Sequence, residues 1–212
     1  VKSLLPEGTT LAQFTDQYIQ SSQKVGPSMA DDIKNAAFLA VVFAMFCMAA
    51  YILLRFRDIS FSVGAFASVA VTTLCIISFY TLLWKVLPFS MEVDQTFIAA
   101  ILTIIGYSIN DTVVVFDRIR ETIGLYPKRD RYQVINDALN STLSRTFNTS
   151  LTTLVVVLCI FILGGATIRS FTFAILLGII IGTYSTLFVA TPIAYELQKK
   201  KINKKAAAEA GK

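Results

Sequence analysis

Five long hydrophobic segments decide what this chain can fold into. They cover residues 36–54, 59–84, 95–116, 146–168 and 170–195, and each is long enough to cross roughly 30 Å of membrane hydrocarbon as a helix. Of the 212 residues, 55% are hydrophobic and only 16% are charged, which is less charge than a soluble domain of this size carries. The sequence therefore predicts an all-α, polytopic membrane bundle of five transmembrane helices.

The basic residues are divided unequally between the two sides of such a bundle. With loops on alternate sides, 14 of the 19 Lys and Arg residues fall on the side that carries residues 55–57, 118–145 and 199–212. The positive-inside rule places this side in the cytoplasm. We therefore expect the N-terminus outside and the C-terminus in the cytoplasm. The same bias explains the net charge of +5, so that charge does not indicate nucleic-acid binding.

Several kinds of chemistry have no support in the sequence. The chain has no histidine, and its three cysteines lie in apolar stretches without the spacing of a metal site. His-based metal sites and His proton shuttles are thereby excluded, and we predict no metal site. Neither a catalytic nucleophile motif nor a phosphate-binding loop is visible. We therefore predict that the protein is not an enzyme and has no cofactor.

One carboxylate lies where it is energetically costly. Asp111 interrupts the apolar third segment, beside Asn110. A charged residue inside a membrane helix is by default a candidate for ion or proton handling, so we interpret Asp111 as a proton carrier, with protons as the coupling ion. In the alternative interpretation, the carboxyl group hydrogen-bonds a neighbouring helix and never titrates. Asp117, at the basic end of the same segment, is predicted to have a structural role, through ion pairs or in setting the topology.

The fourth segment carries a polar stripe. Residues 141, 145, 148 and 152 follow an i, i+4, i+7, i+11 spacing and share one helix face, which we expect to face the bundle interior or water. Arg145 on this stripe is predicted to pair reversibly with Asp111 and so to couple protonation to helix movement. Alternatively, Arg145 extends to the cytoplasmic interface. The supporting polar residues we select are Asn110, Thr112, Ser144 and Asn148.

Small residues predict where helices approach one another. Gly178 and Gly182 form a GxxxG pattern in the fifth segment, and Gly106 lies in the third. Helices in lipid associate through such residues, so we predict a packing role for all three glycines, within the chain rather than in a dimer. The fourth and fifth segments are joined by a very short turn around Gly164 and Gly165, so we expect them to be antiparallel neighbours.

A sixteen-residue run, Gly106–Glu121, resembles the signature of the SecF family of protein-export subunits, or of the SecF half of a fused SecDF. Residues 25–28, 140–153, 182–185 and 191–192 resemble the same family, so the resemblance covers about 25–197. SecF proteins belong to the resistance-nodulation-division superfamily and have six spans, with an extracytoplasmic domain after the first. The resemblance implies that residues 1–30 end that domain or form a linker. Residues 31–197 are then the five-helix transmembrane domain, and 198–212 a basic cytoplasmic tail.

The resemblance also implies a function and partners. It predicts a bacterial inner-membrane subunit that uses the proton gradient to assist translocation of secretory proteins, with Asp111 handling protons and Arg145 as its partner. The expected partners are SecD or a SecD half of the same chain, the Sec translocon, a secretory preprotein and membrane lipid, without nucleic acid. Many SecF sequences carry a His-Asp pair in the third span, but residues 70–73 contain neither. The alternatives are a proton-driven exporter of small molecules or lipids, and a non-titrating scaffold for the translocon.

Overall fold

A computed structural model describes residues 27–87, 89, 91 and 94–210, and residues 1–26 of the expected extracytoplasmic part lie outside it. The described residues form helices and connecting turns, without a strand. The elements are α2 (Pro27–Phe56), α3 (Ile59–Leu83), α4 (Gln95–Leu125), α5 (Arg131–Leu163), α6 (Ala166–Ser185), a π-helical turn η2 (Thr186–Ala190) and α7 (Thr191–Ala210). Five helical stretches in this part of the chain are long and apolar enough to cross a membrane, which confirms the all-α membrane fold.

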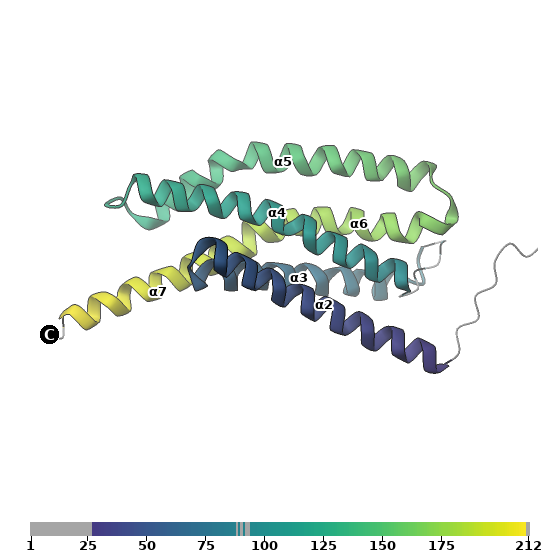
Figure 1. Ribbon diagram of the computed structural model, residues 1–212. Coiled ribbons are helices and arrows are strands. Elements are labelled where there is room, and N and C mark those ends of the chain that lie inside the picture. Colours follow the sequence, from purple (N-terminus) through teal and green to yellow (C-terminus); the bar gives the residue numbers. More distant parts are fainter. Residues whose placement is uncertain (1–26, 88, 90, 92–93, 211–212) are drawn as a thin grey trace, which may run out of the picture. The chain divides into compact units, whose positions relative to one another are not determined.

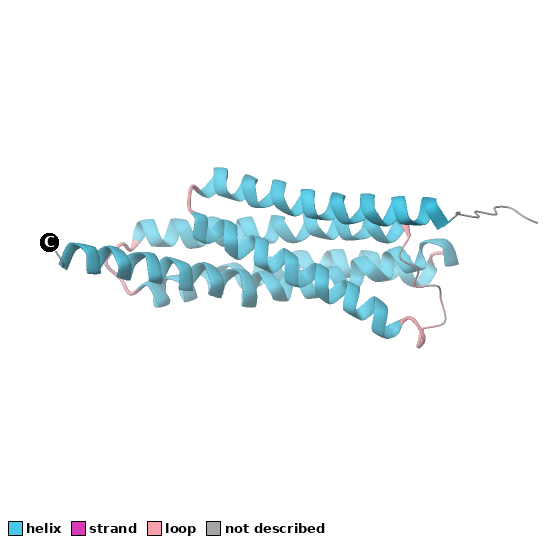
Figure 2. Ribbon diagram, turned by 90° about the horizontal axis from the view of Figure 1, so that it is seen from below, coloured by secondary structure: helices cyan, strands magenta, loops and turns pink. Residues whose placement is uncertain are grey.

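The residues from Ala37 onward form one compact unit with α4 and α6 at its centre. Helix α4 packs against α3, α5 and α6, and α6 packs against α3, α4 and α5. Helices α4 and α5 form one antiparallel hairpin, and α5 and α6 form the next (Figure 1, Figure 2). In α2, Ile52 and Phe56 are buried, whereas Phe43 and Phe46 are exposed. An apolar outward face of this kind suits a helix that faces lipid.

Aspartates fix the starts of three helices. Asp58 accepts a hydrogen bond from the Ser60 N–H (3.1 Å), and Asp94 accepts one from the Phe97 N–H (2.9 Å). Asp130 accepts one from the Gln133 N–H (3.3 Å), so α5 begins directly after it. Each carboxylate satisfies a backbone N–H that lacks a partner in the first helical turn. These caps fix the residue at which each of α3, α4 and α5 begins.

The predicted bounds of the fourth membrane segment are wrong. A span at 146–168 is predicted from the sequence, but α5 is one helix from Arg131 to Leu163. It ends there because Gly164 and Gly165 have extended backbone, and a Cβ on Gly164 would clash with the carbonyl oxygen of Ile160. Helix α6 begins immediately after the two glycines. The predicted antiparallel pair of helices joined by this short turn is confirmed.

The last membrane segment contains a π-helical turn that the sequence analysis did not predict. Pro192 lacks a backbone N–H, so an ordinary α-helix would leave a carbonyl one turn earlier without its donor. The widened turn at Thr186–Ala190 precedes this proline, and the Thr191 hydroxyl donates to the Thr186 carbonyl (3.2 Å). Such local adjustments are how membrane helices tolerate proline.

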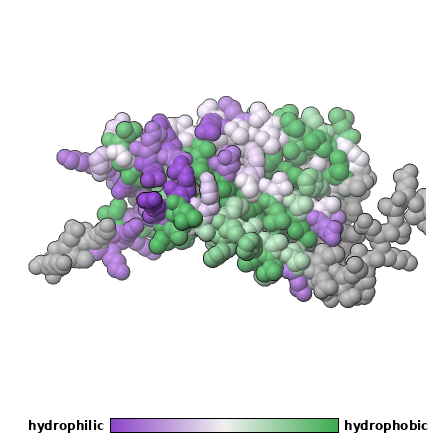
Figure 3. All heavy atoms as spheres, viewed as in Figure 1, coloured by the Kyte–Doolittle hydropathy of each residue, from purple (hydrophilic) through white to green (hydrophobic). Residues whose placement is uncertain are grey.

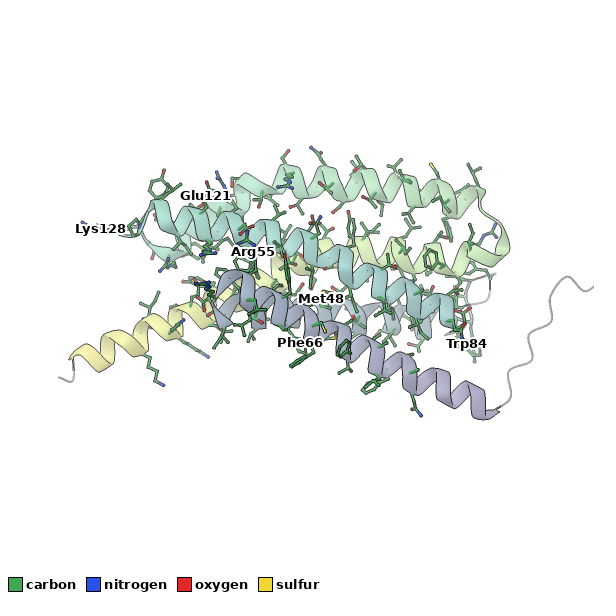
Figure 4. All side chains as sticks on the ribbon, in the orientation of Figure 1. Met48, Arg55, Phe66, Trp84, Glu121 and Lys128 are labelled. Atoms are coloured by element: carbon green, nitrogen blue, oxygen red, sulfur yellow. The ribbon has the colours of Figure 1, made fainter. Side chains whose placement is uncertain are left out.

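Polar side chains gather at one end of the bundle. Hydrophilic residues concentrate around the α4–α5 turn in Figure 3, and Lys128 in this turn lies at the opposite end from Trp84 (Figure 4). Arg55 and Glu121 lie toward the same end as Lys128 (Figure 4). We call this the basic end, because it carries the Lys and Arg residues that the positive-inside rule uses to predict the orientation.

Candidate functional site

Asp111 lies in the middle of α4 and points into the bundle rather than toward the surrounding lipid. Its exposed fraction is 7%. The buried residues Ile104, Ser108 and Val115 lie on the same face of α4, at spacings of three to four residues. This face packs against the neighbouring helices, so the carboxylate lies among α4, α5 and α6.

Two hydroxyl groups connect Asp111 to the neighbouring helices. The Ser150 hydroxyl of α5 donates to Asp111 Oδ2 over 3.4 Å. The same hydroxyl lies 2.7 Å from Thr183 Oγ1 of α6. One short chain of side chains therefore joins α4, α5 and α6 at the level of the carboxylate.

The protons of these hydroxyls cannot satisfy every acceptor at once. Thr183 donates its proton to the carbonyl oxygen of Ile179 (2.8 Å), so the single proton of Ser150 is divided between Thr183 and Asp111. An ionised carboxylate offers about four acceptor sites. Among the described residues, Asp111 fills one of them, with a long hydrogen bond. Buried polar groups are normally hydrogen-bonded, so this carboxylate is poorly satisfied as an anion.

Further hydroxyls continue from this site to the π-helical turn. Thr112 is fully buried, donates to the Ser108 carbonyl (3.0 Å) and lies 3.0 Å from Thr186 Oγ1 in η2. The Ser68 hydroxyl of α3 lies 3.0 Å from Ser185 Oγ. The buried Ser108 hydroxyl has no hydrogen-bond partner among the described residues. A polar seam therefore runs through the apolar core beside Asp111.

Arg145 is not paired with Asp111 in the described structure. It lies five residues before Ser150 on α5, which is about 7.5 Å along the axis and about 140° around it. It is exposed and lines a groove of about 350 Å³ with Asp117, Glu121 and four other residues. The structure therefore brings Asp111 together with Ser150, and it places Arg145 nearer the basic end.

The polar stripe of α5 does not face the bundle interior, which was one of the two environments expected for it, the other being water. Ser141, Arg145, Asn148 and Thr152 are exposed, as is Ser144. The buried face of α5 carries a second polar series at four-residue spacing, Thr142, Thr146 and Ser150. Compact hydroxyls can bond within their own helix and pack closely, which suits them to the contact with α4 and α6. On α4, Asn110 is likewise exposed.

Of the structural roles predicted for Asp117, the ion pair is confirmed. Its carboxylate lies 2.9 Å from the guanidinium of Arg55, which joins α4 to α2. Glu121 is paired with Arg118 on the same helix (2.8 Å). Both pairs are exposed. Exposed ion pairs of this kind contribute little to stability. The carboxylate of Asp111, in contrast, is buried.

The three selected glycines have different surroundings. A Cβ on Gly178 would clash with the side chain of Ile104, and one on Gly182 would lie 3.2 Å from Ser108 Oγ. Both glycines therefore bring α6 close to α4. Gly106 is exposed, and a Cβ there would have no neighbour within 4 Å among the described residues. It makes no close helix contact in this part of the chain.

Three residues of the site were missed by the sequence analysis. Ser150 and Thr183 make the chain to Asp111, and the Tyr107 hydroxyl reaches Thr153 Oγ1 on α5 (3.2 Å). The sequence signal for Ser150 is its four-residue spacing with Thr142 and Thr146. The stripe through Arg145 is a second polar series on the same helix, and spacing alone does not show which of the two packs inward. Thr183 directly follows the GxxxG pattern, but nothing in its local sequence indicates which helix it contacts.

Comparison with known proteins gives a consistent result for most of the chain. Residues 7–200 match the family described as "Protein export membrane protein SecD/SecF, C-terminal". The chain is 46% identical over 186 residues to the protein translocase subunit SecF of Rhodothermus marinus, covering 88% of this chain and 60% of that one. It is 40% identical over 190 residues to SecF of Petrotoga mobilis, covering 89% and 61%. The chain thus spans about three fifths of the length of these relatives.

Solved structures with a similar fold are known. A crystal structure of SecDF in a super-membrane-facing form matches with a TM-score of 0.75 and 32% identity, over 93% of this chain and 27% of that one. A crystal structure of SecDF from Thermus thermophilus, described as a translocon-associated membrane protein, matches with a TM-score of 0.75 and 36% identity. That match covers 88% of this chain and 26% of the SecDF chain.

Proposed function

The chain belongs to the SecD/SecF C-terminal family of protein-export membrane proteins, and from that premise we propose that it is the proton-handling membrane part of a SecF-type export subunit. It is a multi-pass protein of the bacterial inner membrane. In the proposed function, uptake and release of a proton by Asp111 drive a helix rearrangement that assists secretory proteins across the membrane. The subunit acts without a cofactor and is not an enzyme.

The buried, poorly satisfied carboxylate of Asp111 is the observation that carries this proposal. A buried charge costs several kcal/mol unless it is paired or well hydrogen-bonded, and taking up a proton removes that cost. Asp111 has one long hydrogen bond from Ser150, whose proton it shares with Thr183. A change in protonation at Asp111 therefore changes which acceptor Ser150 bonds, and with it the contact between α4, α5 and α6.

The exposed polar stripe of α5 supports a partner at this face. Arg145, which lies toward the basic end, and Asn148, less than one turn further along α5, are exposed on its outer face and are not covered by the described part of the chain. We propose that SecD, or a SecD half of the same chain, covers this face, and that the assembly works with the Sec translocon on a secretory preprotein. In this arrangement Arg145 contacts Asp111 only in another conformation of the cycle. The proposed orientation has the N-terminus outside and the basic end in the cytoplasm.

The function is tested by export into inverted inner-membrane vesicles, with and without a proton gradient. Vesicles that lack the complete protein should lose the gradient-dependent part of export, and adding the protein back should restore it. Restoration of small-molecule or lipid efflux without any effect on secretion would assign the protein to the other exporters of its superfamily. Restoration by the complete protein with Asn at position 111 would make it a scaffold that does not titrate.

Ser150→Ala is expected to slow the gradient-dependent part of export by roughly two- to tenfold, the kinetic equivalent of losing one hydrogen bond of about 0.5–1.5 kcal/mol. The substitution leaves Asp111 in place but removes its hydrogen-bond donor. Ser78→Ala is the matched control, because the exposed Ser78 hydroxyl bonds only the Leu74 carbonyl of its own helix. Equal export rates for the two variants would show that Ser150 takes no part in proton handling.

A further inference from the structure

A second polar pocket, separate from Asp111, lies at the basic end of the bundle. Its volume is about 280 Å³. Arg120 of α4, Arg131 of α5 and Lys201 of α7 line it, together with Asp58 before α3 and Gln198 of α7. Parts of the chain that are far apart in sequence therefore converge on one cavity.

The pocket carries an excess of positive charge that the chain itself does not neutralise. Asp58 is its only acidic lining residue. This carboxylate caps α3 through the Ser60 N–H and lies 3.4 Å from the Lys201 ammonium. Arg120 and Arg131 form no ion pair with the described residues, although Arg55, Arg118 and Arg129 at the same end each have a carboxylate partner. Two guanidinium groups in the pocket are therefore available to an anion.

Gln198 adds an amide group to the same pocket. Its exposed fraction is 9%, it lines the pocket, and no hydrogen bond joins its side chain to the described residues. Its amide NH2 group is therefore available to donate to an oxyanion held by the two arginines.

The remaining walls of the pocket are apolar. Phe56 and Phe61 are almost completely buried, and Ile123 lines the same cavity. The pocket lies where the membrane-length helices α2, α3 and α4 end or begin, which is the depth of lipid headgroups. Guanidinium forks match the oxygens of a phosphate, and basic pockets between membrane helices bind anionic headgroups. A soluble anion would make no use of the apolar wall.

We propose that this pocket binds the phosphate of an anionic phospholipid, with Arg120 and Arg131 holding the phosphate oxygens and Gln198 donating a further hydrogen bond. The glycerol and upper acyl chains lie against Ile123 and Ile202, the apolar lining residues that have accessible surface. This site is independent of the proton role proposed for Asp111. A bound lipid would connect the end of α4, the start of α5 and the middle of α7, which meet at the pocket.

The test is native mass spectrometry of the complete protein in detergent, titrated with phosphatidylglycerol, phosphatidylcholine or inorganic phosphate. We expect preferential binding of phosphatidylglycerol. The double substitution Arg120→Gln and Arg131→Gln should weaken it by on the order of ten- to thirtyfold, because two cations near the headgroup are lost. The matched control is Arg129→Gln with Lys199→Gln, which removes two basic residues at the same end that do not line the pocket. This control should retain the affinity of the unmodified protein.

Three outcomes would overturn the proposal. The first is equal binding of phosphatidylglycerol by the pocket and control variants, and the second is equal binding of phosphatidylcholine and phosphatidylglycerol by the unmodified protein. The third is that inorganic phosphate competes for the pocket as well as the lipid does, which would indicate a soluble anion as the ligand. A charge-preserving variant, Arg120→Lys with Arg131→Lys, separates lost binding from lost folding. It should bind phosphatidylglycerol more tightly than the glutamine variant does.

Discussion

Asp111→Asn is expected to abolish the part of protein export that depends on the proton gradient, leaving the rate seen when the gradient is collapsed. Asparagine has nearly the same size as aspartate and can still accept a hydrogen bond from Ser150, so the packing of α4 against α5 and α6 is retained. It cannot take up or release a proton, and this is the only property that the account requires of the carboxylate. The measurement is export of a secretory protein into inverted vesicles, with the gradient present and then collapsed.

The matched control for this variant is Asp137→Asn. Asp137 is an exposed residue of α5 that pairs with Arg129 over 2.8 Å, so its loss removes one negative charge and one surface ion pair. Such a pair contributes about 0–1 kcal/mol, and export should stay at the level of the unmodified protein. If Asp111→Asn exports as well as Asp137→Asn and keeps the same dependence on the gradient, Asp111 is not the proton carrier.

A large effect on stability is expected at Gly64, where α3 meets the π-helical turn. A Cβ on Gly64 would lie 2.6 Å from the carbonyl oxygen of Ala190 and 3.3 Å from the Cβ of Ala194. The first of these neighbours is backbone and cannot rotate away, so the two helices must move apart. We expect Gly64→Ala to lower the free energy of unfolding by about 1–3 kcal/mol, and Gly64→Val by more.

Gly106→Ala is the control for this prediction. Both glycines lie inside membrane helices, but the added methyl at Gly106 has no neighbour within 4 Å among the described residues. Alanine is also the better helix former by up to about 1 kcal/mol, so this variant should be neutral or slightly more stable. Unfolding of the purified protein in mixed detergent can be followed through Trp84, the single tryptophan of the chain. Equal midpoints for Gly64→Ala and Gly106→Ala would contradict the close approach of α3 and η2.

Hydropathy alone predicted much of the fold. The five membrane segments follow from their length and apolar composition, because a helix is the structure that satisfies its backbone hydrogen bonds within one segment. The antiparallel α5–α6 pair follows from the short Gly164–Gly165 turn. The π-helical turn was not predicted, because the backbone adjusts locally to Pro192 and the surrounding residues give no periodic signal of it. The boundary between α5 and α6 was misplaced because the hydrophobic run continues across the two glycines.

The candidate site was only partly predictable. Asp111 was found because a carboxylate in an apolar helix is rare and costly, and its burial agrees with that reasoning. Its contacts were not found, because α5 carries two polar series on different faces and spacing alone does not decide which one packs inward. The structure turns Ser150 toward Asp111 and Arg145 outward. That choice depends on the fit of hydroxyl groups between three helices, which is a property of the assembled bundle.

Infrared difference spectroscopy of the complete protein in lipid bilayers reports whether the carboxyl group of Asp111 changes its protonation state, which the proposed function requires. We expect a carbonyl stretching band of a protonated carboxyl group that appears on acidification and disappears at higher pH. The band should be absent from the Asp111→Asn variant and retained in Asp137→Asn. If no pH-dependent carboxyl band is lost in Asp111→Asn, Asp111 does not carry the proton.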